Sequence, residues 1–196
     1  MENKQTAIPS VHAPPAEAAA RPRQLPAWVI VLAFLVLMGF LGLIAWGLNR
    51  AQQGSIQIHD AVPSFTLTGF DGNDYKTADM AGKVIVVNFW ASWCKPCEQE
   101  AADMEAAWKT YQPNGNVIFL GVDWVDTAPE AKSYLNQFGI TYLNGPDLRT
   151  AISQIFRIKG VPETYILGKD GHLANVKIGP FSSVAEIQTM VDPLLK

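Results

Sequence analysis

The sequence has few of the residues that build metal centres and disulfide frameworks. Among its 196 residues are two cysteines and three histidines. Cys94 and Cys97 are three positions apart and cannot join distant segments, which excludes a disulfide-laced scaffold. The histidines at positions 12, 59 and 172 are scattered along the chain and form no visible ligand cluster. We therefore expect no metal and no other cofactor, and a chemical role for the cysteine pair.

Positive charge is also scarce in the larger part of the chain. From Ser55 onward, 11 lysines and arginines stand against 16 aspartates and glutamates. A mildly acidic domain lacks the basic surface that nucleic acid requires, so we expect no nucleic-acid partner. We find no internal repeat.

Charge is missing altogether from one long segment. Residues 27–48 are 22 in a row without a charged side chain. At about 1.5 Å per residue they span roughly 33 Å as a helix, enough for a hydrocarbon core of about 30 Å. Trp28 and Trp46 bracket the segment, as amphipathic rings do at the two headgroup levels. A buried core helix is the alternative, but such helices are shorter. The segment predicts a transmembrane helix.

The flanks of this segment predict its orientation. Arg21 and Arg23 precede it, whereas Arg50 alone follows it, and this small excess places the N-terminus in the cytoplasm. A cleaved signal peptide is the alternative, because residues 45–47 loosely fit a cleavage site. The apolar region of such peptides is only about 7 to 15 residues long, so we favour a retained single-pass signal anchor.

Four regions follow from this organisation. Residues 1–26 hold five prolines and six alanines with almost no aromatic residues, and we expect a disordered cytoplasmic tail. Residues 27–48 are the transmembrane anchor, and residues 49–60 a stalk. Residues 61–196 form a globular domain on the extracytoplasmic side of a bacterial cytoplasmic membrane.

Strand and helix patterns alternate through this domain. The continuous apolar run at 84–90 predicts a strand buried on both faces. Asp170 and Gly171 predict a hairpin turn, which makes the sheet mixed. The other expected elements are strands at 65–68, 117–122, 164–167 and 173–178, and helices at 94–111, 127–138, 147–156 and from 183 onward. The fold class is therefore α/β.

The cysteines lie where a buried strand ends and a helix begins. Three-residue spacing across a first helical turn brings two Cα atoms to about 5 to 6 Å, which suits a Cys94–Cys97 disulfide. Cys94, at the exposed helix N-terminus, is the expected attacking thiolate, and the more shielded Cys97 resolves the mixed disulfide. Pro96 is tolerated because the first-turn amide it lacks has no intrahelical acceptor.

Two plainer interpretations of the pair remain. One is half of a zinc or copper site, which would need ligands that the histidines do not supply. The other is two inert buried thiols. Glu98 follows the pair and excludes a Cys-x-x-Cys-His haem attachment site. A Cys-x-x-Cys between strand and helix is typical of a redox pair, which we favour.

Two motifs carry a resemblance to a known family. Residues 88–97 (NFWASWCKPC) and 160–164 (GVPET) resemble the membrane-anchored thioredoxin-like proteins of the TlpA, ResA and CcmG (DsbE) group. The resemblance implies a thioredoxin-like fold with a mixed central sheet flanked by helices and a strand-helix insertion around 117–143. It also implies a cis-Pro162 facing the cysteines, beside which an extended substrate segment can pair.

Glu100 is a further candidate. It lies about 60° from the centre of the apolar stripe of its helix, where partial burial raises a carboxyl pKa. A solvated helix glutamate is the plainer interpretation. The resemblance implies that Glu100 lies near the active site and tunes thiol acidity.

Other residues around the pair have supporting roles. Lys95 favours the Cys94 thiolate and so opposes Glu100; it also departs from the Glu-Pro and Pro-Thr pairs common in the group. Trp93 is a surface aromatic or a platform for substrate. Asn88 and Trp90 support the site from the strand. Glu163 belongs to the second motif but could equally be an ordinary strand residue, so we rank it below Glu100 as a site residue.

The resemblance implies an extracytoplasmic thiol-disulfide oxidoreductase. It implies reduction of protein disulfides, most naturally the haem-site cysteines of apocytochrome c in cytochrome c biogenesis, with electrons from a membrane donor of the CcdA or DsbD type. The alternatives are a disulfide-forming oxidant, a peroxiredoxin-like antioxidant enzyme, suggested by residues 65–74, and a non-catalytic binding module.

Overall fold

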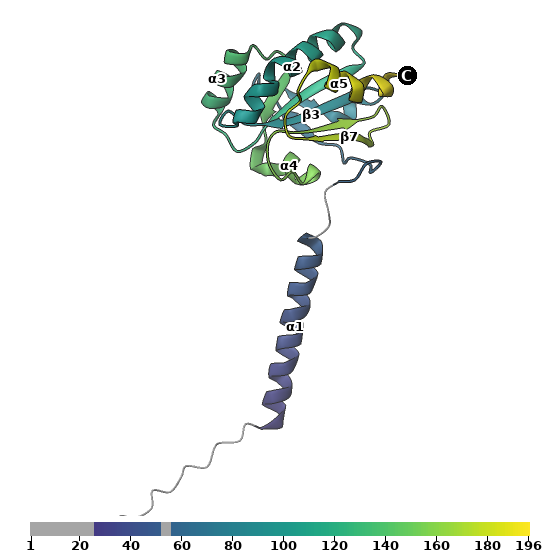
Figure 1. Cartoon of the computed structure of the whole chain (residues 1–196). Coiled ribbons are helices and arrows are strands. Elements are labelled where there is room, and N and C mark those ends of the chain that lie inside the picture. Colours follow the sequence, from purple (N-terminus) through teal and green to yellow (C-terminus); the bar gives the residue numbers. More distant parts are fainter. Residues whose placement is uncertain (1–25, 52–55) are drawn as a thin grey trace, which may run out of the picture. The chain divides into compact units, whose positions relative to one another are not determined.

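A computed structural model describes residues 26–51 and 56–196, and the chain divides into two compact units at residues 52 and 53. In the first unit, helix α1 (Ala27–Ala51) contains the uncharged residues 27–48, whose mean hydropathy is 2.8 (Figure 1). By length and composition this helix can cross a membrane. It extends through Asn49 and Arg50, so the first residues of the predicted stalk are helical. The predicted tail lies outside the described residues except for Pro26.

In residues 56–196, five strands form one mixed sheet in the order β5-β4-β3-β6-β7. Strand β3 pairs in parallel with β4 and β4 with β5, whereas β3–β6 and β6–β7 are antiparallel. The strands are β3 (Val84–Trp90), β4 (Val117–Asp123), β5 (Leu143–Pro146), β6 (Glu163–Leu167) and β7 (Leu173–Ile178). Strands β1 (Thr66–Thr68) and β2 (Asp74–Lys76) form a separate two-stranded sheet.

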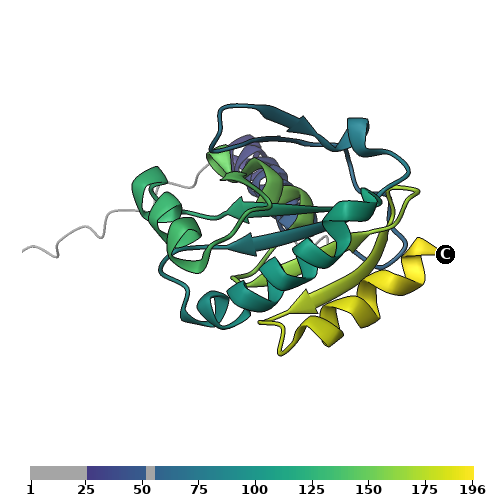
Figure 2. The same cartoon turned by 90° about the horizontal axis from the view of Figure 1, so that it is seen from above.

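Helices cover both faces of the central sheet. Helices α2 (Lys95–Tyr111) and α5 (Val184–Val191) pack on one face, and α4 (Ala151–Phe156) packs on the other (Figures 1 and 2). Helix α3 (Ala128–Phe138) follows β4. The predicted α/β fold with a mixed sheet flanked by helices is confirmed.

Strand β3 is the centre of the domain. All of its residues are buried, because its side chains alternate between two cores. Val84 and Val86 face α2 and α5, whereas Val87 and Phe89 face α4. A strand buried on both faces needs the continuous apolar sequence that predicted it. Its last residue, Trp90, is paired with Asp123, so β3 and β4 end side by side at the same end of the sheet.

One helix differs from its prediction. The sequence predicts a helix at 147–156 with Asp147 as its cap, but the α-helix begins at Ala151, after a short 3-10 turn. The Asp147 carboxylate still accepts the first free amides, from Ile152 at 2.8 Å and Ser153 at 2.9 Å. Arg149 and Thr150 have positive φ angles, which interrupt the helix between Asp147 and these amides.

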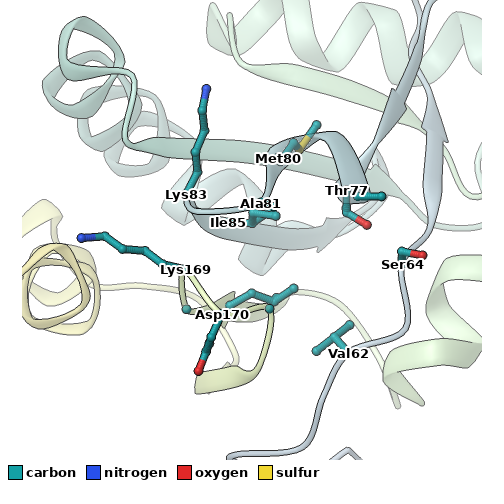
Figure 3. A pocket seen from close by; sticks show the side chains of 13 residues that line it. Val62, Ser64, Thr77, Met80, Ala81, Lys83, Ile85, Lys169 and Asp170 are labelled. Atoms are coloured by element: carbon teal, nitrogen blue, oxygen red, sulfur yellow. The ribbon is translucent and has the colours of Figure 1, made fainter.

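A cavity of about 210 Å³ lies at the end of the sheet opposite to the cysteines (Figure 3). Val62, Thr77, Met80 and Lys83 are among the residues that line it. Lys83 immediately precedes β3, whereas the cysteines follow the other end of that strand. None of the predicted site residues lines this cavity.

Candidate active site

The cysteines form a disulfide at the start of α2. Cys94 is the N-cap, its Sγ accepts a hydrogen bond from the Cys97 amide at 3.2 Å, and the Cα atoms are 5.3 Å apart. Pro96 lies in the first helical turn, as predicted. The prediction that Cys94 is exposed is wrong for this oxidised form: Cys94 is 3% exposed and Cys97 1%. Neighbouring side chains cover the two cysteines, whereas Lys95 and Pro96 between them are exposed.

Those neighbours form a cluster around the disulfide. Its buried members are Trp90, Ala91, Ala101, Ala131 and Tyr134, with Phe70 and Val161 among the half-buried side chains packed on them. The rings of Trp90 and Tyr134 stack at 4.5 Å between centroids. Because Ala131 and Tyr134 belong to α3, this helix supplies one wall of the redox centre.

The loop that leads into β6 borders the same cluster. The Val161–Pro162 peptide bond is cis, and Val161 packs against the cysteine cluster. Glu163 is 3% exposed and holds this loop, because its Oε1 accepts the amides of Lys159 at 2.9 Å and Gly160 at 3.1 Å. Its Oε2 accepts the Tyr165 hydroxyl at 2.7 Å. Glu163, which the sequence ranked below Glu100, thus has defined positioning contacts.

Glu100 is 2% exposed, which rules out the plainer interpretation of a solvated glutamate. Its Oε1 accepts Asn88 Nδ2 at 2.8 Å, and its Oε2 accepts the Phe181 amide at 2.9 Å. Burial raises the pKa of Glu100 to about 7, although these two donors lower it. Glu100 follows Cys97 by one helical turn, so the two side chains are neighbours on α2.

Lys95 contributes less to the site than its sequence position predicts. Its Nζ pairs with the Glu98 carboxylate at 2.8 Å, and its side chain is 83% exposed. The charge that would favour a Cys94 thiolate is therefore partly neutralised by Glu98 and screened by solvent.

Trp93 is 56% exposed beside Cys94. Its indole Nε1 donates to the Val125 carbonyl at 3.1 Å, and its ring centroid is 6.2 Å from that of Trp124. Val125 is itself 62% exposed and has a positive φ of 54°, which is unusual for a β-branched residue. Two apolar side chains thus stand exposed next to the reactive pair, held by the loop that follows β4.

Two aspartates, one at the end of β4 and one in the loop that follows it, were missed from the sequence. Asp126 accepts the Ser92 amide at 2.6 Å and so anchors the active-site loop. Asp123, opposite Trp90 in the sheet, is 2% exposed; burial and then the Asp126 charge raise its pKa to about 7. Because β3 and β4 are parallel, both end at one edge of the sheet. Polar residues directly after strand 117–122 could therefore have been predicted to lie near the cysteines.

Comparison with known proteins gives consistent relatives. The family model named AhpC/TSA matches residues 58–176. The chain is 30% identical over 150 residues to the thiol-disulfide oxidoreductase ResA of Bacillus thuringiensis, covering 76% of this chain and 86% of the relative.

Solved structures share the fold. A thiol:disulfide interchange protein DsbE from Chlorobium tepidum superposes with a TM-score of 0.67 at 23% identity, covering 72% of this chain and 100% of the other. A thioredoxin family thiol:disulfide interchange protein from Chlorobium tepidum TLS superposes with a TM-score of 0.65 at 28% identity, covering 73% and 100%.

Proposed function

Because the chain belongs to the AhpC/TSA family, as a thiol-disulfide oxidoreductase of the ResA and DsbE type with the redox pair Cys94 and Cys97, we propose that it reduces protein disulfides. The observation that carries this proposal is the buried disulfide at the N-terminus of α2, with the Glu100 carboxyl group one turn behind it. A helix N-terminus favours the Cys94 thiolate, the attacking species in disulfide exchange.

The reaction is a two-step exchange. The Cys94 thiolate attacks one sulfur of a substrate disulfide; that S–S bond breaks, and the leaving sulfur departs as a thiolate that takes a proton. Cys97 then loses its proton and attacks Cys94 Sγ, which releases the second substrate thiol and forms the Cys94–Cys97 disulfide. The substrate gains two electrons and two protons.

Glu100 has a place in the second step. Cys97 is 1% exposed, so bulk water reaches its thiol poorly. A carboxyl group with a pKa of about 7 can accept a proton near neutral pH and return it. We assign to Glu100 the tuning of the thiols in this step, and to Val161 and Pro162 a backbone edge that receives the extended substrate segment.

The cellular setting that we propose rests on the uncharged residues 27–48 and their flanking arginines, and the substrate and electron donor rest on the family resemblance. Residues 27–48 anchor the protein as a single-pass signal anchor, residues 49–60 form a stalk, and residues 61–196 form the catalytic domain on the extracytoplasmic side. The substrate class we favour is the haem-site disulfide of apocytochrome c, in cytochrome c biogenesis. A membrane donor of the CcdA or DsbD type would reduce the Cys94–Cys97 disulfide after each cycle.

Trapping tests this proposal. The probe is a peptide with an intramolecular Cys-x-x-Cys-His disulfide, mixed with the reduced full chain in detergent micelles. The Cys97→Ser variant should accumulate a mixed disulfide with the peptide, visible by mass, because no resolving thiol remains. The Cys94→Ser variant should form none. Undiminished peptide reduction by Cys94→Ser would contradict every thiol mechanism at this site.

Two alternatives are separated by further measurements. An oxidant that forms disulfides would use the same residues in reverse, and only its reduction potential distinguishes it. A peroxidase activity is suggested by the family match, although a peroxidatic site normally uses a lone cysteine. Consumption of hydrogen peroxide faster than reduction of the peptide would favour the peroxidase.

A further inference from the structure

A row of polar side chains leads away from Glu100 across the sheet. Asn88 of β3 is paired with Thr164 of β6, and Thr164 is paired with Lys177 of β7. Asn88 Nδ2 donates both to Glu100 Oε1 and, at 3.0 Å, to Thr164 Oγ1. These positions lie on the face covered by α2 and α5, as Val86 does two residues before Asn88. The row runs from the centre of the sheet to β7, its edge strand within residues 56–196.

Lys177 ends this row and is held there by two contacts. Its Nζ forms an ion pair with the Glu186 carboxylate of α5, and it lies 5.7 Å from the Phe181 ring centroid. The backbone amide of Phe181 is the second donor to Glu100. Glu186 is fixed in turn by the Ser182 amide at 2.8 Å and the Ser182 hydroxyl at 2.9 Å. Two routes therefore connect Glu100 to Lys177. One runs through the Asn88 side chain to Thr164, the strand partner of Lys177, and the other runs through Phe181.

The charges around Glu100 act in opposite directions. Lys177 lowers the pKa of Glu100, and Glu186 raises it. The side chains of Lys177 and Glu186 are only 26% and 30% exposed, so solvent screens them incompletely. Burial and then the Glu100 charge raise the pKa values of Tyr134 and Tyr142. Cys97 lies one helical turn before Glu100 on α2. Among these groups in the described residues, Lys177 carries the one positive charge.

We propose that Lys177 is a positioning residue for disulfide exchange that acts through Glu100, and that Glu186 sets how much of the Lys177 charge Glu100 experiences. This inference rests on the proposed function, because it assigns to Lys177 the control of the group that tunes Cys97. In this arrangement Lys177 and Glu186, and not only the cysteine motif, determine the pH range in which the thiols exchange.

The test compares two substitutions that should act in opposite directions. The full chain, labelled with carboxyl-¹³C glutamate, is titrated by NMR in detergent micelles, and Glu100→Gln identifies the Glu100 signal. Lys177→Met removes the cation and should raise the Glu100 midpoint by about half a pH unit, a roughly threefold change in the ionised-to-neutral ratio. Glu186→Gln frees the Lys177 charge from its anion and should lower the midpoint.

Matched controls separate electrostatics from lost packing. Lys177→Arg keeps the charge and should restore the wild-type midpoint. Lys83→Met removes an exposed lysine at the opposite end of β3 and should leave it unchanged. A merely structural role would give shifts in the same direction for Lys177→Met and Glu186→Gln, or no shift, and either result would overturn the proposal.

The pH profile of peptide reduction is measured on the same variants. Its rise should move to higher pH in Lys177→Met and to lower pH in Glu186→Gln, as the Glu100 midpoint does. A moved midpoint with an unmoved rate profile would overturn the role of Lys177 in exchange. If the wild-type chain reduces no disulfide while the midpoints still move in opposite directions, the proposed function fails and the coupling of Lys177 to Glu100 stands.

Discussion

The Glu100 carboxyl group determines much of the chemistry expected at the scale of single residues. It is buried, yet its two oxygens accept hydrogen bonds from Asn88 and Phe181, so it can exist in either protonation state. Its pKa rises from an ordinary 4.5 to about 7 on folding. Between these values the folded protein holds a proton that the unfolded chain has released. Stability therefore falls as pH rises through this window, by on the order of 3 kcal/mol.

Glu100→Gln should remove this part of the pH dependence. The free energy of unfolding of the oxidised full chain, measured with urea in detergent at several pH values between 4 and 8, should fall less steeply in the variant. Asp123 has a raised pKa of about 7 and contributes a fall of the same sign, so Asp123→Asn is the matched comparison. An unchanged slope in Glu100→Gln would show that Glu100 titrates normally.

At the scale of elements, the sequence predicts those parts whose burial is continuous or whose caps are local. The apolar run of β3 and the Thr127 cap of α3 are of this kind, since Thr127 Oγ1 accepts the Glu130 amide. Strand β5 was missed because its sequence, Leu-Asn-Gly-Pro, has neither alternation nor β-branched residues. Strand β2 was also not predicted, because it is short and largely exposed and so shows no buried face in its sequence.

The active site, too, has residues that the sequence predicts and contacts that it does not. The cysteine pair was predicted from its spacing, whereas the place of Glu100 near it was implied by the family resemblance. The contact of Asp126 with Ser92 joins residues 34 positions apart, and no local pattern encodes it. Glu163 was visible in the sequence, but its three donors depend on how the 159–165 segment folds back.

Asp126→Ala should loosen the loop that carries Trp93 and Cys94. The variant removes the acceptor of the Ser92 amide, which is half-buried, so losing this partner costs about 1 kcal/mol or more. Hydrogen exchange of the Ser92 amide should accelerate roughly tenfold, since about 1.4 kcal/mol corresponds to a factor of ten. The pKa of Asp123 should fall, because the Asp126 charge raises it. Unchanged Ser92 exchange would show that other contacts hold the loop.

At the scale of the whole molecule, an apolar helix and an acidic thioredoxin-like domain share one chain. As a membrane anchor, this helix would confine the domain to the membrane surface, where the proposed membrane electron donor would be accessible. The orientation rests on Arg21 and Arg23 against Arg50.

Reporter fusions after Lys196 test this orientation. An alkaline phosphatase fusion, active only outside the cytoplasm, should be active, and a reporter that functions only inside should be silent. The reverse pattern would place the catalytic domain in the cytoplasm and contradict the localisation.

The reduction potential of the Cys94–Cys97 pair tests the central claim most directly. It is measured on the full chain in detergent by equilibration with glutathione or dithiothreitol buffers, with the fluorescence of Trp90 and Trp93 as the probe. A disulfide reductant requires a potential near or below that of thioredoxin, about −270 mV, and this is the predicted result. A potential near that of DsbA, about −120 mV, would mean that the protein accepts electrons from its substrates and would contradict the proposed function.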